Sequence, residues 1–145
     1  MNTFDAKQFR EQIRILERKL GLLKKSTESN NELTLTQCHT LVEIGRAHTI
    51  SLKDLSLILA IDLSTTSRTV ANLVKKSYVQ RTPSIQDRRS VDITLTSTGQ
   101  TLFNHIETTN NTFFQEVFEN IPLEKRESVL TALEIILEAF QQEAK

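Results

Sequence analysis

Residues 51–96 constrain the fold of this chain more than any other part of its sequence. Their first segment has four apolar residues at helical spacing, Leu52, Leu55, Ile58 and Leu59. Ser51 opens that segment as an N-cap, and Asp62 caps a second helical segment after a short break. Two segments of alternating polarity follow, at 79–81 and 91–95, on either side of a loop with turn-forming residues. This order predicts a winged helix-turn-helix: two short helices, a tight turn and a two-stranded wing.

The second predicted helix has an apolar side and a polar side. Its inward positions are expected to be Thr66, Val70, Leu73 and Val74. The opposite face, near the N-terminus of the helix, then carries Ser64, Thr65, Arg68 and Asn72. Hydroxyls and an arginine can bind base edges and phosphates, and the amides of a helix N-terminus can bind a phosphate. We therefore expect this helix to enter the major groove of DNA. The alternative is a solvated helix face that begins with a Ser-Thr cap.

The loop of the predicted wing carries the adjacent charged residues Asp87, Arg88 and Arg89. Two neighbouring arginines in a hairpin point to opposite sides, so one can enter the minor groove while the other lies along the DNA backbone. An arginine in the minor groove is sensitive to the narrow width of A·T-rich DNA. The alternative interpretation is that Asp87 and Arg89 only brace the hairpin.

These residues resemble the MarR family of bacterial transcription regulators. The wing has the family's D-x-R-x5-L-T spacing, from Asp87 to Leu95 and Thr96, and the segments at 33–37 and 63–81 are similar as well. The resemblance implies that Arg89 is the fixed arginine of that pattern. It also implies a homodimer that binds a pseudo-palindromic operator on double-stranded DNA as a repressor, and that a small-molecule effector or a redox signal releases it. Ser77 departs from the pattern, because the family usually has a glycine there, and serine in a left-handed cap costs about 1 kcal/mol.

The sequence predicts a mainly α-helical fold with a small β-wing, in one compact domain overall. Residues 33–96 are expected to form the winged helix-turn-helix, and residues 1–32 and 97–145 a helical dimerisation region. Before the motif, an apolar seam is formed by Phe9, Ile13, Leu16, Leu20 and Leu23; the last helix has one formed by Val129, Leu133, Ile136, Leu137 and Phe140. These seams fit either a small bundle within one chain or a bundle shared by two copies. The family resemblance implies the shared bundle.

Charge is unevenly distributed along the chain. The 18 basic and 18 acidic residues give no net charge, but residues 62–89 have six basic against two acidic residues, a local charge of +4. Residues 97–145 have three basic against eight acidic residues, a local charge of −5. This asymmetry fits a protein that presents one face to phosphates. A single cysteine, the absence of a secretion signal at the start and the absence of an apolar run of about 18 residues predict a soluble, cytoplasmic protein with no membrane partner.

The sequence contains no motif that predicts an enzyme, a cofactor or a metal site. Its three glycines lie far apart, and there is no HExxH, CxxC or nucleophile elbow. Cys38 and His39 are adjacent, and two interpretations of them stay open. Cys38 is either a small buried hydrophobic residue, with His39 bonded to Glu43, or this pair senses a redox or metal signal. The competing function class is a winged-helix protein-interaction module without sequence-specific DNA binding.

Overall fold

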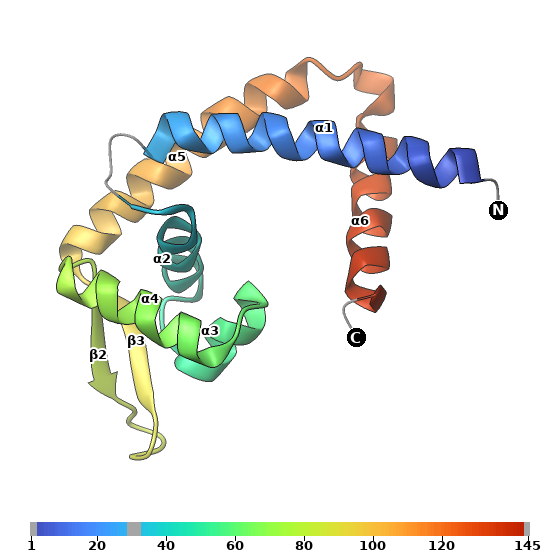
Figure 1. Cartoon of the computed structure of the whole chain (residues 1–145). Helices are drawn as coiled ribbons and strands as arrows, with labels where there is room; N and C mark the ends of the chain where they lie inside the picture. Colours follow the sequence, from blue (N-terminus) through green and yellow to red (C-terminus); the bar gives the residue numbers. More distant parts are fainter. Residues whose placement is uncertain (1–2, 29–32, 144–145) are drawn as a thin grey trace. The chain divides into compact units, whose positions relative to one another are not determined.

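The computed structural model describes residues 3–28 and 33–143, with side chains described for 5–21 and 33–143. Helices take up 74% of the structure and the remaining regular structure is one small antiparallel sheet, so the predicted mainly α-helical winged-helix fold is confirmed. The elements of Figure 1 are α1 (Thr3–Glu28), α2 (Leu35–Ala47), β1 (Ile50–Ser51), α3 (Leu52–Leu59), α4 (Leu63–Lys75), β2 (Val79–Pro83), β3 (Val91–Leu95), α5 (Ser97–Glu119), the 3₁₀ helix η1 (Leu123–Lys125) and α6 (Arg126–Glu143). Among the described residues, the helices are all too short or too polar to cross a membrane.

The chain divides into two compact units, residues 1–103 and residues 104–145. The division falls inside α5. The predicted limit of the winged motif at 96/97 stays a prediction. In the first unit, α2, α3 and α4 pack together and against the sheet, and Figure 1 shows the two long strands of the wing projecting from these helices. The core of this unit consists of fully buried side chains, namely Leu41, Ile44, Leu55, Val70, Leu73, Val79 and Ile93.

Local hydrogen bonds explain where the helices of the first unit begin. Thr34 and Gln37 form the capping box at the start of α2. Ser51 accepts a hydrogen bond from the N–H of Asp54 at 3.1 Å, and Asp62 caps α4. Between them Ala60 adopts a left-handed conformation, with φ 56°, which ends α3 and makes the tight turn.

The wing is a three-stranded sheet in the order β1-β3-β2. β3 pairs antiparallel with both neighbours: Ile93 lies opposite Ile50 of β1 and opposite Arg81 of β2. β2 extends two residues further than the sequence predicted, to Pro83, because its pairing with Val91 continues to that point. The sheet is therefore anchored by the buried Ile93 and leaves the far end of the hairpin in solvent.

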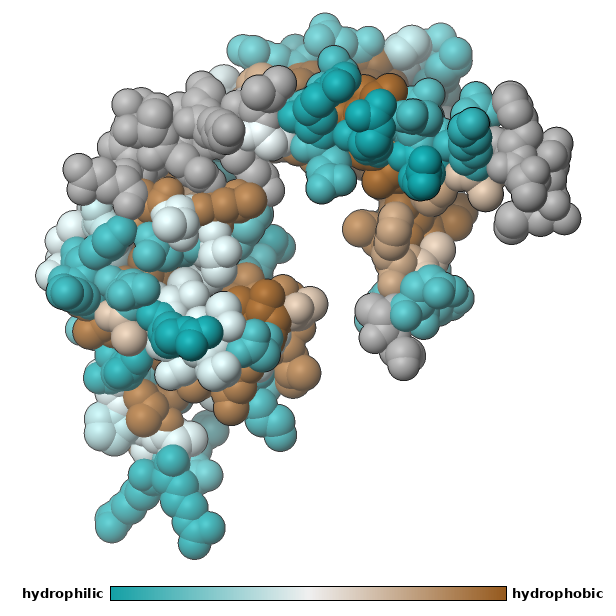
Figure 2. All heavy atoms as spheres, viewed as in Figure 1, coloured by the Kyte–Doolittle hydropathy of each residue, from teal (hydrophilic) through white to brown (hydrophobic). Residues whose placement is uncertain are grey.

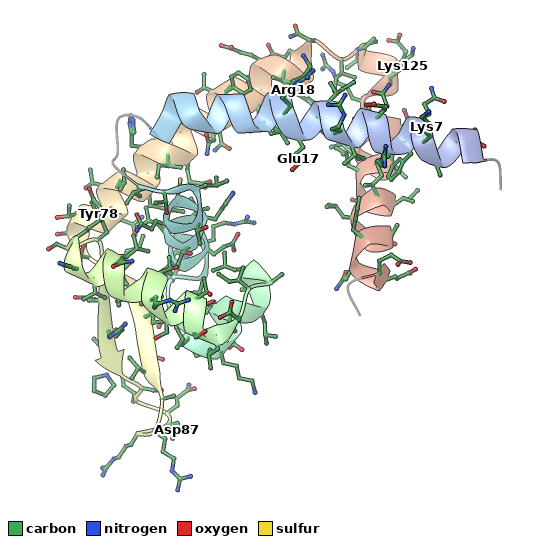
Figure 3. The ribbon with its side chains drawn as sticks, viewed as in Figure 1. Lys7, Glu17, Arg18, Tyr78, Asp87 and Lys125 are labelled. Atoms are coloured by element: carbon green, nitrogen blue, oxygen red, sulfur yellow. The ribbon has the colours of Figure 1, made fainter. Side chains whose placement is uncertain are left out.

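One junction ties the end of α4 to the wing and to α5. Ser77 has φ 70°, a left-handed conformation that favours glycine. The hydroxyl of Thr96 donates to the carbonyl of Ser77 at 2.6 Å and accepts from the N–H of Gly99 at 3.0 Å. A Cβ at Gly99 would lie 1.9 Å from the carbonyl oxygen of Tyr78, so only glycine fits there. Tyr78 is labelled in Figure 3.

The second unit exposes much of its apolar surface. Arg126 closes the turn before α6: it donates to the carbonyls of Ile121 and Glu119 and lies over the ring of Phe118. The following large apolar residues of α6 are between 43% and 68% exposed: Leu130, Leu133, Ile135, Leu137 and Phe140. Figure 2 shows hydrophobic residues on the visible face of this helix.

In the first unit, α1 also has exposed apolar residues. Phe9 and Leu16 of the predicted seam are exposed, and Leu23 lies outside the described side chains.

Candidate nucleic-acid interface

The start of α4 is organised by the carboxylate of Asp62. It accepts hydrogen bonds from the hydroxyl of Ser64 at 2.5 Å, from the hydroxyl of Thr65 at 2.7 Å and from the backbone N–H of Thr65 at 2.8 Å. These bonds, that from Ser64 first, hold the pKa of Asp62 well below its usual range. Asp62 is exposed, and its carboxylate is ionised at neutral pH.

Arg68 is connected to the same group of residues. One of its guanidinium nitrogens donates to the hydroxyl oxygen of Thr65 at 3.3 Å, so Thr65 donates to Asp62 and accepts from Arg68. Ser64, Arg68 and Asn72 are exposed and Thr65 is half-buried, while Thr66, Val70 and Leu73 are buried on the opposite side. The polar face predicted for this helix is thus at the surface.

Two of the amides at the start of α4 are already bonded to Asp62. The N–H of Thr65 donates to the carboxylate of Asp62, and the N–H of Thr66 donates to the backbone carbonyl of Asp62 at 3.0 Å. The carboxylate also places a negative charge where a phosphate would bind, which opposes the attraction of the helix dipole. Phosphate binding at this helix start stays a prediction.

The tip of the wing is a turn closed by short side chains. The hydroxyl of Ser84 accepts from the N–H groups of Gln86 and Asp87, both at 3.3 Å. Asp87 accepts from the N–H of Arg89 at 3.0 Å, and the N–H of Ser84 donates to the carbonyl of Ser90 at 3.1 Å. The turn therefore has a defined backbone, although every residue from 85 to 89 is exposed.

Arg88 and Arg89 project from this turn without an acidic partner. Asp87 accepts a hydrogen bond from the backbone N–H of Arg89 and makes no ion pair with its guanidinium. Among the residues that the structure describes, the ion pairs are Arg14–Glu11 on α1 and Arg46–Glu43 on α2, so neither involves the wing. Figure 3 labels Asp87 at the end of the wing, and Figure 2 shows hydrophilic side chains there.

Two further residues of the wing were not singled out from the sequence as contact residues. Ile85 is 99% exposed beside the two arginines, and Arg81 is exposed on β2. Arg81 could have been found from its place in the basic segment. Nothing in the sequence distinguishes Ile85 from a residue that folds back onto the hairpin, because a turn has no side-chain periodicity.

Cys38 and His39 lie on α2, where Cys38 is half-buried and His39 is exposed. Within the described part of the chain, no three His, Cys, Asp or Glu side chains come close enough to hold a metal ion. Glu43, one turn further along α2, approaches Arg46 at 3.8 Å. A sensing role for Cys38 or His39 stays a prediction.

The fold and the exposed face together define a regulator of the winged helix-turn-helix class. The model of the MarR family matches residues 33–91. The HTH-type transcriptional regulator SarZ of Staphylococcus saprophyticus is 34% identical over 110 residues, which cover 72% of this chain and 75% of that protein. The chain belongs to the MarR family, and it is a transcription regulator and not an enzyme.

Solved structures have the same fold. The structure of Streptococcus pneumoniae FabT in complex with DNA has a TM-score of 0.85 at 20% identity, covering 97% of this chain and 99% of that one. The Staphylococcus aureus MepR–DNA complex has a TM-score of 0.78 at 20% identity, covering 91% of this chain and 97% of that one. At this identity, the two structures support the fold only.

Proposed function

We propose that this MarR-family regulator binds double-stranded DNA as a homodimer and represses transcription from a pseudo-palindromic operator. In this proposal α4 enters the major groove, where its contact residues are Ser64, Thr65, Arg68 and Asn72. The wing follows the minor groove through Asp87, Arg88 and Arg89. A small-molecule or redox signal releases the DNA by changing the separation of the two recognition helices.

The observation that carries the proposal is the set of exposed arginines in the first unit. Arg88 and Arg89 make no ion pair with an acidic residue within the described chain, and Arg68 bonds only to a neutral hydroxyl. Guanidinium groups left without carboxylate partners are available to phosphates and base edges. The DNA complexes of FabT and MepR, which share this fold, also support DNA as the partner.

The exposed apolar surface of α6 and α1 supports a homodimer. Large apolar side chains that stay half-exposed in one chain are expected to be covered in the functional assembly. We expect that deleting the residues before Gln12 or after Ile135 gives an aggregating or monomeric chain without DNA affinity. A truncated chain that stayed folded, monomeric and tightly bound to DNA would contradict the shared bundle.

Salt-dependent binding is the direct test of the proposed DNA partner. The purified protein is titrated against fluorescent duplexes selected from a randomised pool, at two or more salt concentrations. We expect the logarithm of the affinity to fall linearly with the logarithm of the salt concentration, since phosphate contacts release counterions. Failure to enrich any duplex, with no binding to random DNA at low salt, would exclude this function.

A second candidate function is a protein-interaction module, and one observation favours it. Leu57, Ile58 and Leu63 are exposed around the turn between α3 and α4, where a partner protein would find an apolar surface. The salt titration separates the two functions, because a module of this kind would not bind duplexes with a salt-dependent affinity.

The release signal is tested through Cys38. If Cys38 is only a packing residue, Cys38→Ser lowers stability slightly and leaves the response of DNA binding to peroxide and to zinc unchanged, and this is the result we expect. Release of DNA by peroxide that disappears in Cys38→Ser would show that the thiol is the sensor. Screening small molecules for release of the selected duplex would test the alternative signal.

A further inference from the structure

The hydrogen bonds around Asp62 determine what the hydroxyls at the start of α4 can offer to DNA. An ionised carboxylate has no proton, so Ser64 and Thr65 are both donors in their bonds to Asp62. A hydroxyl has one hydrogen, and therefore neither residue can donate to DNA while these bonds persist. What remains on Ser64 is acceptor capacity. Thr65 already accepts from Arg68, so Ser64 is the less committed of the two hydroxyls.

Acceptor capacity restricts which DNA groups Ser64 can recognise. Phosphate oxygens, guanine O6 and N7, and thymine O4 are all acceptors, and they need a donor from the protein. In the major groove only the amino groups of adenine N6 and cytosine N4 are donors. A hydroxyl whose hydrogen is already bonded can therefore discriminate adenine and cytosine from guanine and thymine.

We propose that Asp62 is a positioning residue that fixes Ser64 as a hydrogen-bond acceptor, so that the start of α4 selects a base amino group and disfavours phosphate. This inference rests on the proposed function, because it requires α4 to enter the major groove. The charge of Asp62 acts in the same direction. A helix N-terminus without an acidic cap attracts anions, whereas the carboxylate repels the phosphate that would otherwise bind there. Asp62 thus lowers affinity for DNA in general and raises discrimination between sequences.

The first test uses the wild-type protein and the duplexes that it selects from a randomised pool. Each adenine of a selected half-site is replaced by purine deoxyriboside, and each cytosine by an analogue without the amino group. We expect one position per half-site where loss of the amino group lowers affinity by at least about fivefold. In Ser64→Ala the same replacement should have no effect at that position, which separates Ser64 from contacts made by Asn72.

The second test compares Asp62→Asn with the matched variant Asp54→Asn. Both remove one negative charge from the first unit, but Asp54 lies in the first turn of α3 and its carboxylate has no bond to either hydroxyl of α4. Asparagine remains a good N-cap, so α4 should still form. We expect Asp62→Asn to bind random duplexes about threefold more tightly and to lose about fivefold in the ratio of selected to random affinity. Asp54→Asn should leave this ratio unchanged.

The outcomes distinguish this inference from the proposed function. If the wild-type protein selects no sequence from the pool, the proposed function itself fails. If it selects a sequence but no amino-group position depends on Ser64, or if Asp62→Asn keeps the wild-type ratio, the role of Asp62 is wrong and DNA binding stands. Should Asp62→Asn prove unfolded by circular dichroism, the analogue experiment on the wild-type protein decides alone.

Discussion

Helix α4 and the tip of the wing present their arginines in opposite ways. Arg68 is bonded to Thr65, and through Thr65 it is linked to the carboxylate that caps the helix. Arg88 and Arg89 have no such side-chain partner, and at the tip it is the backbone that is held, by Ser84 and Asp87. Reading individual bases requires donors at fixed positions, whereas following the width of a groove requires long side chains on a fixed support. In the proposed DNA complex, we therefore expect α4 to read individual bases and the wing to follow the groove.

The largest effect is expected from Arg68→Ala. If Arg68 contacts a base through two hydrogen bonds, its loss should cost about 1–3 kcal/mol and relax preference at one position per half-site. Binding curves for single-base variants of the selected duplex measure this change. An equal loss of affinity for all sequences, with a smaller salt slope, would show that Arg68 contacts only phosphate. The arginines of α4 and of the wing would then not differ in the way proposed.

Arg89→Ala should weaken binding by about tenfold and reduce the preference for A·T flanks, because the narrow minor groove attracts a guanidinium. The fold and the dimer should be unchanged, since this side chain is exposed and makes no ion pair. Affinities for duplexes with A·T and with G·C flanks, and the melting temperature, check these points. Equal affinity for wild type and variant on both duplexes would mean that Arg89 does not enter the groove.

Comparing Asp87→Ala with Asp87→Asn measures how much the hydrogen bond that holds the tip of the wing contributes to DNA affinity. Both remove the charge, but only asparagine keeps an oxygen that can accept from the N–H of Arg89. A hydrogen bond of this kind contributes about 1 kcal/mol, so the alanine variant should bind about fivefold more weakly than the asparagine variant. Identical affinities would show that the tip needs no support from this side chain.

The smallest effect is expected from Arg88→Ala, which should lower affinity by about threefold and reduce the salt slope by about 1. The flank preference should stay as in the wild type, because this side chain is expected to lie along the DNA backbone. Titrations at several salt concentrations give both quantities. If Arg88→Ala instead lost the A·T preference, the roles of the two arginines would have to be exchanged.

Features that depend on neighbouring residues in the sequence could be predicted. The caps at Ser51 and Asp62 each follow from a few adjacent residues, and the structure confirms them. The left-handed conformation of Ser77 was implied by the family resemblance, and the structure has it. The polar face of α4 follows from helical periodicity, which also explains why its opposite side is buried.

Features that depend on distant residues or on competing partners could not be predicted. The ammonium group of Lys76 donates to the side-chain oxygen of Gln37, 39 residues earlier, which no local pattern indicates. The ring of Phe103 in α5 lies against Gly45 of α2, another contact between residues far apart in the sequence. The bond of Asp87 also has competing partners, because the backbone N–H of Arg89 and its guanidinium are both near in the sequence, and the structure has the bond to the N–H.

The junction at Thr96 has a mechanical consequence for regulation. Because the side chain of Thr96 bonds both to Ser77, just after α4, and to Gly99 in the first turn of α5, we expect α4, the wing and the start of α5 to move as one rigid body. α5 continues beyond residue 103 into the second unit. In the proposed DNA complex, a movement of the first turn of α5 would then carry α4 and the wing with it and leave both contact surfaces internally unchanged.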